Sequence, residues 1–449
     1  MRVAFYTLGC KLNQCETETL ASIYARQGFF VVPWSEKADI FIFNTCTVTS
    51  KSEQKARRII RKVRRENPHA LICITGCYAQ VAGDDLKRNF PYAEILPIGR
   101  KLDLADAASK AADLLKGRGE IGMIQRVFTT AIEEIRESKI RRKTVFLNAV
   151  EKDRLRSRPY FKIQDGCNNR CAYCRVPVAR GRSKSLGTDA AVEGVRELEK
   201  NGYGEVVLTG VNISLYRSTG ENGSVSRLPD LLESVLTGTE RIRIRLSSIE
   251  PDALKPELLR ILGHPRIRPH FHLPIQSGSE RILELMNRKY TADQLKEAVY
   301  TLREIKDNPC ISADVIVGFP GENEADFEET ETLIRALRFS QLHVFQFSRR
   351  PDTPAFSMKP SVPERIMKHR SRRILKLSEE LYKKYAESCV GSFLETVVEH
   401  GGSGTVKRGT TENYLRIGIR GPEVNNLVPG RNCRVKLCFV NEFYGELES

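Results

Sequence analysis

Short apolar runs alternate with amphipathic stretches along the first quarter of the chain. The runs at 2–8, 38–46, 71–77 and 93–99 have the length and the β-branched or aromatic content of buried strands. The stretches between them have helical periodicity. Strands that alternate with helices predict a parallel α/β sheet, which we expect over residues 1–114.

The same alternation returns in the middle of the chain, after a charged stretch at 115–152 that we interpret as a linker. Six βα units are predicted within residues 153–386, which suits a partial barrel better than a closed eight-stranded one. Its active site should lie at the C-terminal ends of the strands. The predicted strands are 160–164, 205–210, 241–248, 270–276, 311–318 and 341–347.

The last part of the chain has a third pattern. Residues 364–388 form a basic amphipathic pattern typical of a long helix. Apolar runs at 394–400, 413–419 and 434–440 follow, separated by Gly, Asn and Pro turns, and predict a small β-barrel at 387–449. The predicted fold class is therefore α/β: an N-terminal parallel α/β domain, a central partial six-unit barrel and a small C-terminal β-barrel.

The charge of the chain favours a polyanionic partner, nucleic acid above all. The 449 residues carry a formal net charge of +16. Basic residues gather in 51–65 (eight against one acid), 139–162 (nine against two) and 365–384 (eight against two). A charge run is also typical of a solvated helix face, so a generally basic soluble protein stays open.

We expect a cytoplasmic protein without membrane contact. No apolar run approaches the ~20 residues that a membrane span needs, and the N-terminus lacks the pattern of a signal peptide. The twelve cysteines would then lie in a reducing compartment, where metal binding or redox chemistry is more common than disulfides.

Three of these cysteines lie on one tight loop, "QDGCNNRCAYCRVP", directly after the first strand of the predicted barrel. Cys167, Cys171 and Cys174 form a CxxxCxxC motif, the loop triad. Structural zinc and ordinary 4Fe-4S sites use four protein ligands. Three thiolates can hold three irons of a 4Fe-4S cluster and leave the fourth open for S-adenosylmethionine, whose reductive cleavage gives a radical. An incomplete zinc knuckle is the alternative.

The loop triad, with Tyr173 before its last cysteine, resembles the signature of the radical SAM superfamily. The resemblance implies further cofactor contacts at the ends of later strands, where ordinary turn or cap roles are the alternative. The expected S-adenosylmethionine contacts are Tyr173, Thr209, Gly210, Asn212, Ser247, Gln276, Asp314 and Gly318.

Another three cysteines, the N-terminal triad of Cys10, Cys46 and Cys77, each follow a predicted strand of the N-terminal domain. They could therefore converge at one sheet edge, or be buried structural residues. "TLGCKLNQCETE", "FNTCTVT" and "ITGCYAQ" resemble the N-terminal domain of the methylthiotransferases. The resemblance implies that this triad holds a second 4Fe-4S cluster, and that the C-terminal barrel is similar to the TRAM RNA-binding module.

The remaining six cysteines have no assigned chemistry. No ligand role is given to Cys15, and we expect the other five to be core residues. These are Cys73, Cys310, Cys389, Cys433 and Cys438.

The methylthiotransferases modify N6-isopentenyladenosine in tRNA, N6-threonylcarbamoyladenosine in tRNA, or an aspartate of a ribosomal protein. "TLGCKLNQCETE" and "DGCNNRCAYCRVPVARGRSKS" resemble the threonylcarbamoyladenosine branch, since the Gln-Met-Asn and Pro-Lys-Asn runs of the other two are missing. Lys184 and Asp352 depart from the usual arginine and glycine, which leaves substrate detail open.

The resemblance implies addition of a methylthio group to C2 of the modified adenosine next to the anticodon, with two S-adenosylmethionine molecules and two 4Fe-4S clusters. The expected partners are the tRNA anticodon stem-loop and an electron donor of unknown identity, and the protein is expected to be a monomer. No catalytic acid or base is assigned. The same chemistry on another branch's substrate, and a zinc-dependent RNA-binding protein, are the alternatives.

Overall fold

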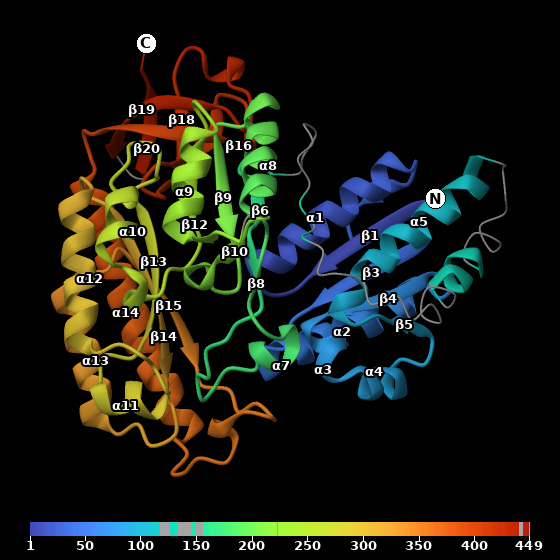
Figure 1. Cartoon of the computed structure of the whole chain (residues 1–449), viewed down its shortest axis with the longest axis horizontal. Coiled ribbons are helices and arrows are strands. Elements are labelled where there is room, and N and C mark those ends of the chain that lie inside the picture. The colour runs from blue at the N-terminus through green and yellow to red at the C-terminus, as the bar shows by residue number, and fades with distance from the viewer. Residues whose placement is uncertain are drawn as a thin grey trace.

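The computed structural model describes residues 1–116, 126–132, 146, 148, 156–221, 223–439 and 443–448. Figure 1 shows an N-terminal α/β domain beside a central barrel, with a small β-barrel at one end of the latter. Most of the predicted linker 115–152 lies outside the described residues. Within it, residues 126–132 are helical, and Phe128 is buried in the core of the N-terminal domain.

The N-terminal domain is a five-stranded parallel sheet of order β2-β1-β3-β4-β5 with helices around it. All four predicted strands are present, and the structure adds the short edge strand β2, which was not predicted. The elements are β1 (Arg2–Thr7), α1 (Lys11–Arg26), β2 (Phe30–Val32), β3 (Ile40–Thr45), α2 (Ser50–Glu66), β4 (Leu71–Gly76), α3 (Cys77–Val81), α4 (Gly83–Asn89), β5 (Ala93–Ile95) and α5 (Lys101–Lys116).

Helix α2 shows how the sequence builds this domain. The side chain of Thr49 accepts a hydrogen bond from the amide of Ser52 and caps the helix. One face buries Ala56, Ile59, Ile60 and Val63 against the sheet, so the dense positive charge of this helix is left on the opposite side.

The central domain contains six parallel strands in two three-stranded sheets, β12-β9-β6 and β13-β14-β15. A bridge between Ile244 and Ile267 continues the first sheet toward the second. The predicted partial barrel is therefore confirmed. Its strands are β6 (Tyr160–Lys162), β9 (Glu205–Thr209), β12 (Arg243–Leu246), β13 (His270–Gln276), β14 (Cys310–Val317) and β15 (Gln341–Gln346).

Helices cover the outside of this barrel (Figure 1), and short elements decorate its loops. The helices are α7 (Val176–Arg180), α8 (Thr188–Lys200), α9 (Leu228–Thr237), α10 (Pro256–Leu262), α11 (Glu280–Leu285), α12 (Ala292–Ile305), α13 (Glu324–Leu337) and the predicted long α14 (Glu364–Ser388). Two small hairpins pair β7 (Gln164–Asp165) with β8 (Lys184–Ser185) and β10 (Arg217–Thr219) with β11 (Val225–Arg227). Among the described helices, none combines the length and apolar character needed to cross a bilayer.

The C-terminal domain is a closed five-stranded barrel, as predicted, although only three of its strands were predicted. Arg268 of the central domain binds Glu395 of this barrel at 2.6 Å, which fixes the two domains together. The strands are β16 (Phe393–Ser403), β17 (Val406–Thr411), β18 (Arg416–Arg420), β19 (Asn432–Phe439) and β20 (Phe443–Leu447).

Candidate active site

The loop triad follows β7 at the C-terminal end of the central barrel. The amide of Cys167 donates to the carbonyl of Gly181 at 3.1 Å, and the amide of Cys174 donates to that of Cys171 at 3.1 Å. Burial, with smaller contributions from the neighbouring Cys171 and Cys167, raises the pKa of the Cys174 thiol to about 12. The three thiols are half-buried and would ionise on binding a cationic metal centre.

Two groups around the loop triad could stabilise bound thiolates. The amide of Asn169 donates to the sulfur of Cys167 at 3.4 Å, and Nη1 of Arg288 donates to the sulfur of Cys171 at 3.2 Å. Arg288 also forms an ion pair with Glu250, which holds the guanidinium in place. Such outer contacts orient ligands and adjust the charge of a metal centre.

The N-terminal triad lies at one edge of the first sheet, where the neighbouring strands β1, β3 and β4 end. Gly9 has a φ of 110°, and a Cβ at this position would lie 2.9 Å from the Cβ of Cys46, so a glycine is needed for the Cys10 loop to approach Cys46. Burial raises the pKa of Cys46 to about 12, with smaller contributions from Cys77 and Cys10. The structure thus brings the three predicted cysteines together.

The spacing of both triads is wider than tetrahedral zinc requires. Within the described part of the chain, one group of three His, Cys, Asp or Glu residues has all its ligand atoms within 4.8 Å, and it contains no cysteine. A zinc ion with Zn–S bonds of about 2.3 Å would hold its sulfurs about 3.8 Å apart. In each triad at least one sulfur–sulfur distance therefore exceeds 4.8 Å, which is longer than one zinc ion would hold it.

A buried ionic network connects the two triads. The side chain of Arg180, at the end of α7, is only 2% exposed. Its guanidinium donates to Glu16 at 3.1 Å, to Asp165 at 2.9 Å and to Asn13 at 2.6 Å. Glu16 also binds Lys162 at 2.9 Å. Arg180 was not predicted as a site residue, although it stands in "VPVARGRSKS" directly after the loop triad.

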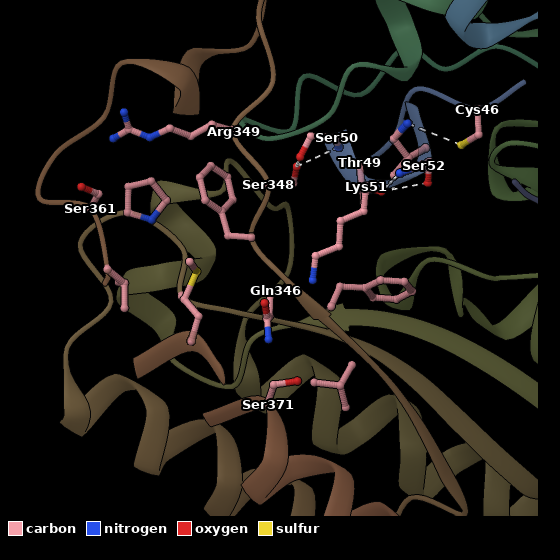
Figure 2. Close-up of a pocket in the computed structure, with 18 of the residues that line it drawn as sticks. Cys46, Thr49, Ser50, Lys51, Ser52, Gln346, Ser348, Arg349, Ser361 and Ser371 are labelled. Atoms are coloured by element: carbon pink, nitrogen blue, oxygen red, sulfur yellow. Dashed lines mark hydrogen bonds between the residues drawn. The ribbon is translucent and has the colours of Figure 1, made fainter. Parts of the chain in front are cut away.

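Two adjoining cavities lead from one triad to the other. The larger, about 860 Å³, reaches Cys10 and Cys46 and is shown in Figure 2. The smaller, about 200 Å³, reaches Tyr173 and Cys174. Six residues line both cavities and form their shared wall: Val48, Thr49, Phe345, Gln346, Phe347 and Ser348.

The remaining predicted cofactor contacts lie on the rim of the central barrel. Gln276 and Asp314 line the smaller cavity, and Gly318 lines the larger one. Thr209 and Ser247 are buried at the ends of β9 and β12. These positions agree with the expected rim, and their contacts with a cofactor stay predictions.

Gly210 and Asn212 lie beside the start of the loop triad. A Cβ on Gly210 would lie 2.8 Å from Oε1 of Gln164, so this backbone packs closely against the strand end. The amide of Asn212 donates to the same Oε1 at 2.9 Å. The Asn212 side chain also interacts with Cys167 and opposes the increase in its pKa that burial causes.

A polar cluster inside the barrel was not predicted. Nε2 of His272 lies 3.1 Å from one oxygen of Asp314, and Nδ1 of His343 lies 3.3 Å from the other. Burial alone would raise the pKa of Asp314, but the two histidines outweigh this effect and lower it. The three residues come from adjacent strands, far apart in the sequence, which is why no such group was identified.

The unassigned cysteines mostly lie in the interior. Cys15, Cys73, Cys310 and Cys389 are buried, whereas Cys433 and Cys438 on β19 are only half-buried. The expectation of core positions is therefore confirmed for Cys73, Cys310 and Cys389. Cys433 packs against the core of the C-terminal barrel from its edge, and the expectation is wrong for Cys438. On a small barrel, a strand is exposed along one face, and a half-buried cysteine fits there.

Two family models match the chain. Residues 161–334 match the radical SAM superfamily, and residues 2–97 match a family described as uncharacterized protein family UPF0004. A threonylcarbamoyladenosine tRNA methylthiotransferase MtaB of Treponema pallidum is 37% identical, over 93% of this chain and 94% of the relative. A protein of the same name from Bacillus subtilis is 35% identical, over 94% and 91%. A tRNA-2-methylthio-N(6)-dimethylallyladenosine synthase of Thermodesulfovibrio yellowstonii is 33% identical, over 88% and 86%.

Among solved structures, the chain is similar to TsrM from Kitasatospora setae, a radical S-adenosylmethionine methyltransferase with cobalamin and a [4Fe-4S] cluster bound. The TM-score is 0.53 at 16% identity, over 79% of this chain and 77% of that one. At this identity the likeness concerns the fold alone.

Proposed function

Since this chain belongs to the radical SAM methylthiotransferase family, we propose that it adds a methylthio group to C2 of N6-threonylcarbamoyladenosine next to the anticodon of tRNA. The observation that carries the proposal is the pair of cysteine triads that open on cavities with a shared wall. The substrate follows from the activity for which the Treponema and Bacillus relatives are named.

Cys167, Cys171 and Cys174 would hold one 4Fe-4S cluster, and Cys10, Cys46 and Cys77 a second. S-adenosylmethionine at the open iron of the first cluster would supply a 5′-deoxyadenosyl radical, while the second would carry the sulfur to be transferred. Radical chemistry suits this task, because the C2–H bond of adenine offers no acidic proton to a general base.

The residues of the chain position the reactants between the triads. The ring of Phe345 is 45% exposed and belongs to the shared wall, so an adenine could pack on its face. The smaller cavity offers Gln276 and Asp314 as polar contacts beside Cys174. Partly buried apolar neighbours such as Phe347 would help to keep water away from a radical.

The basic helices supply phosphate contacts. Helix α2 carries its positive charge on the exposed side, and α14 has exposed basic residues along its length. A tRNA bound across them would direct its anticodon loop to the larger cavity, whose lining includes the start of α2 and part of α14. With this substrate, the cytoplasm is the place of reaction.

Mass spectrometry of tRNA nucleosides tests the proposal directly. Cells that lack the protein should lose 2-methylthio-N6-threonylcarbamoyladenosine and accumulate the unmethylthiolated nucleoside, and the anaerobically reconstituted protein should restore it in vitro. Loss of the isopentenyladenosine derivative instead would assign the other tRNA branch. A colourless protein that holds zinc and no iron would favour the RNA-binding alternative.

A further inference from the structure

The larger cavity has a consistent chemical character away from its cysteine end. None of the described residues that line it is acidic, and two, Lys51 and Arg349, are cationic. Hydroxyl groups surround them, and the apolar part of the wall comes from residues such as Phe345 and Met367. The hydroxyl-bearing lining residues are Thr49, Ser50, Ser52, Ser348, Ser361 and Ser371.

Lys51 is the cation that enters this cavity. Figure 2 shows its side chain extending into the hollow toward Gln346, whereas Arg349 points away from it. Arg349 donates to the carbonyl of Met358 at 3.2 Å. The side-chain ammonium of Lys51 forms neither an ion pair within 4.0 Å nor a hydrogen bond with any residue in the described part of the chain.

The acidic residues near Lys51 are occupied elsewhere. Glu364, at the start of α14, binds Lys368 at 2.7 Å. Glu53, two residues along α2, binds Arg350. Lys368, and to a smaller extent Lys51, lowers the pKa of the Glu364 carboxyl, but among the described residues no carboxylate lies within 4.0 Å of the Lys51 ammonium. Its hydrogen-bond donors are therefore open to an anionic ligand group.

We infer that Lys51 binds the carboxylate of the N6-threonylcarbamoyl group and thereby selects this nucleoside over adenosines with uncharged N6 substituents. The inference rests on the proposed function. The substituent carries a carboxylate and a hydroxyl, which match the ammonium of Lys51 and the hydroxyls of Ser50 and Ser348. The isopentenyl group has no atom that could use them.

A backbone phosphate of the tRNA is the other anion that Lys51 could bind. Substrates that differ only in the carboxylate of the N6 substituent distinguish the two. The substrates are two synthetic anticodon stem-loops, one with N6-threonylcarbamoyladenosine and one with its carboxamide, which differ only in the charge of the side chain. The measured quantity is the ratio of kcat/KM for acid and amide, with methylthiolated product quantified by mass spectrometry.

The reconstituted wild-type enzyme should prefer the acid at least about tenfold, as expected for one charge-assisted hydrogen bond. Lys51→Gln should reduce the ratio to about one, and Lys51→Arg should keep most of it.

Lys55→Gln is the matched control, because Lys55 is exposed one turn further along α2 and lines neither cavity. It should leave the ratio unchanged. Since Lys51 is itself exposed, these variants should fold and bind iron like the wild type.

Each other outcome overturns the inference. If Lys51→Gln slows both substrates equally, Lys51 contacts a phosphate. If the wild type converts acid and amide equally well, the carboxylate is not recognised, although the proposed function stands. If the wild type modifies neither stem-loop but does modify one with isopentenyladenosine, the proposed substrate and the role of Lys51 both fail.

Discussion

The guanidinium of Arg180 is buried between groups that belong to different parts of the molecule. It bonds Glu16 and Asn13 of α1, which starts next to Cys10, and Asp165, which precedes the loop triad. Its charge also acts on the thiol of Cys77. This single side chain therefore connects the two cysteine-bearing loops to each other.

Arg180→Gln should destabilise the protein by about 3–5 kcal/mol, because it leaves Glu16 and Asp165 buried with fewer positive partners. The loss should appear as a lower midpoint of thermal unfolding, followed by circular dichroism under anaerobic conditions. Arg260→Gln is the control: Arg260 forms an exposed pair with Glu233 at 3.1 Å, and removing such a pair costs less than about 1 kcal/mol. Equal midpoints for the two variants would contradict the structural role of Arg180.

The two cysteine triads could be identified from the sequence, whereas the groups that surround them could not. Cys167, Cys171 and Cys174 share one loop, so their spacing alone indicates a metal site. Arg180 and Glu16 are 164 positions apart, and His272, Asp314 and His343 lie on three separate strands. Groups brought together only by strand order leave no local signal in one sequence.

Strands β9 and β12 and the segment just before β13 share a second buried ionic group, at the junction with the C-terminal barrel. Glu205 accepts hydrogen bonds from Arg245 at 2.7 Å and from Arg268 at 2.7 Å, and Arg268 continues to Glu395 on β16. Burial by itself raises the pKa of Glu205, but the two guanidinium groups outweigh it and lower the pKa to about 2.

Glu205→Gln should therefore lower the free energy of unfolding by an amount that depends on pH. The carboxyl has a pKa near 4.3 in the unfolded chain and about 2 in the folded protein, so its contribution of about 3 kcal/mol is complete above pH ~4.3 and is lost as the pH falls toward 2. Urea unfolding should show a large difference in midpoint between wild type and variant at pH 7, and a smaller one at pH 4 and pH 3. A difference that stays constant with pH would show that folding does not shift the pKa of Glu205.

The C-terminal barrel offers a test of RNA binding at the level of one strand. Lys407 and Arg408 lie on β17, and Arg408 is exposed. If both contact phosphates, replacing them with alanine should weaken tRNA binding and reduce the slope of log K against log salt by about 2. Lys296→Ala with Arg260→Ala, on outer helices of the central barrel, is the matched control and should leave the slope unchanged. S-adenosylmethionine cleavage should be intact in both variants.

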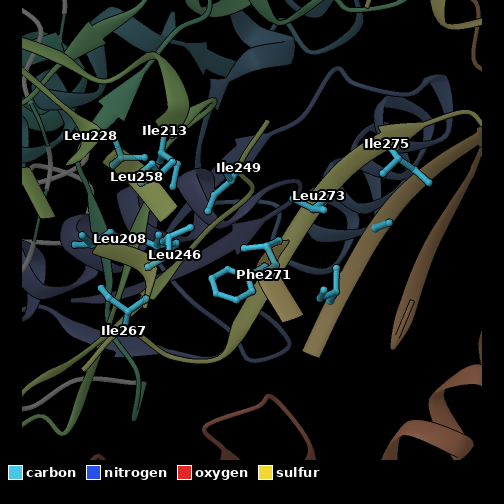
Figure 3. Packing of buried hydrophobic residues seen from close by; sticks show 14 of the residues in the cluster. Leu208, Ile213, Leu228, Leu246, Ile249, Leu258, Ile267, Phe271, Leu273 and Ile275 are labelled. Carbon is cyan, nitrogen blue, oxygen red and sulfur yellow. The ribbon is translucent and has the colours of Figure 1, made fainter. Parts of the chain in front are cut away.

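Elements with strong apolar patterns were predicted well, and weak ones were missed. The strands of the central domain bury one continuous apolar cluster, in which Leu208, Leu246 and Phe271 pack together (Figure 3). Each of these strands therefore has an apolar run that can be recognised in the sequence. Strand β17 reads "VKRGTT" and β20 reads "FYGEL". Barrel closure, rather than an apolar run, makes these segments strands.

At the scale of the whole molecule, the two triads belong to separate folding units that meet across a network of side chains. The N-terminal triad depends on the edge of a five-stranded sheet, and the loop triad on a loop of the central barrel. Each domain has its own apolar core. Loss of one ligand should therefore leave the other metal site assembled.

This separation predicts different defects for Cys46→Ala and Cys174→Ala. After anaerobic reconstitution, the wild type should hold about eight irons, as two clusters of four, and each variant about half. Cys46→Ala should still cleave S-adenosylmethionine to 5′-deoxyadenosine but transfer no methylthio group to tRNA. Cys174→Ala should lose both activities, because an incompletely held cluster at the loop triad cannot bind and reduce S-adenosylmethionine.

Cys15→Ala is the matched control for this pair, because Cys15 is also buried in the N-terminal domain and has no assigned ligand role. It should cost modest stability and keep both the iron content and methylthiolation. The wild type and the three variants are compared in the same anaerobic reaction, in which 5′-deoxyadenosine is measured by chromatography and the tRNA nucleosides by mass spectrometry. Substantial methylthiolation by Cys46→Ala would reduce Cys46 to an ordinary core residue, and the sulfur would then have to reach C2 without the N-terminal triad.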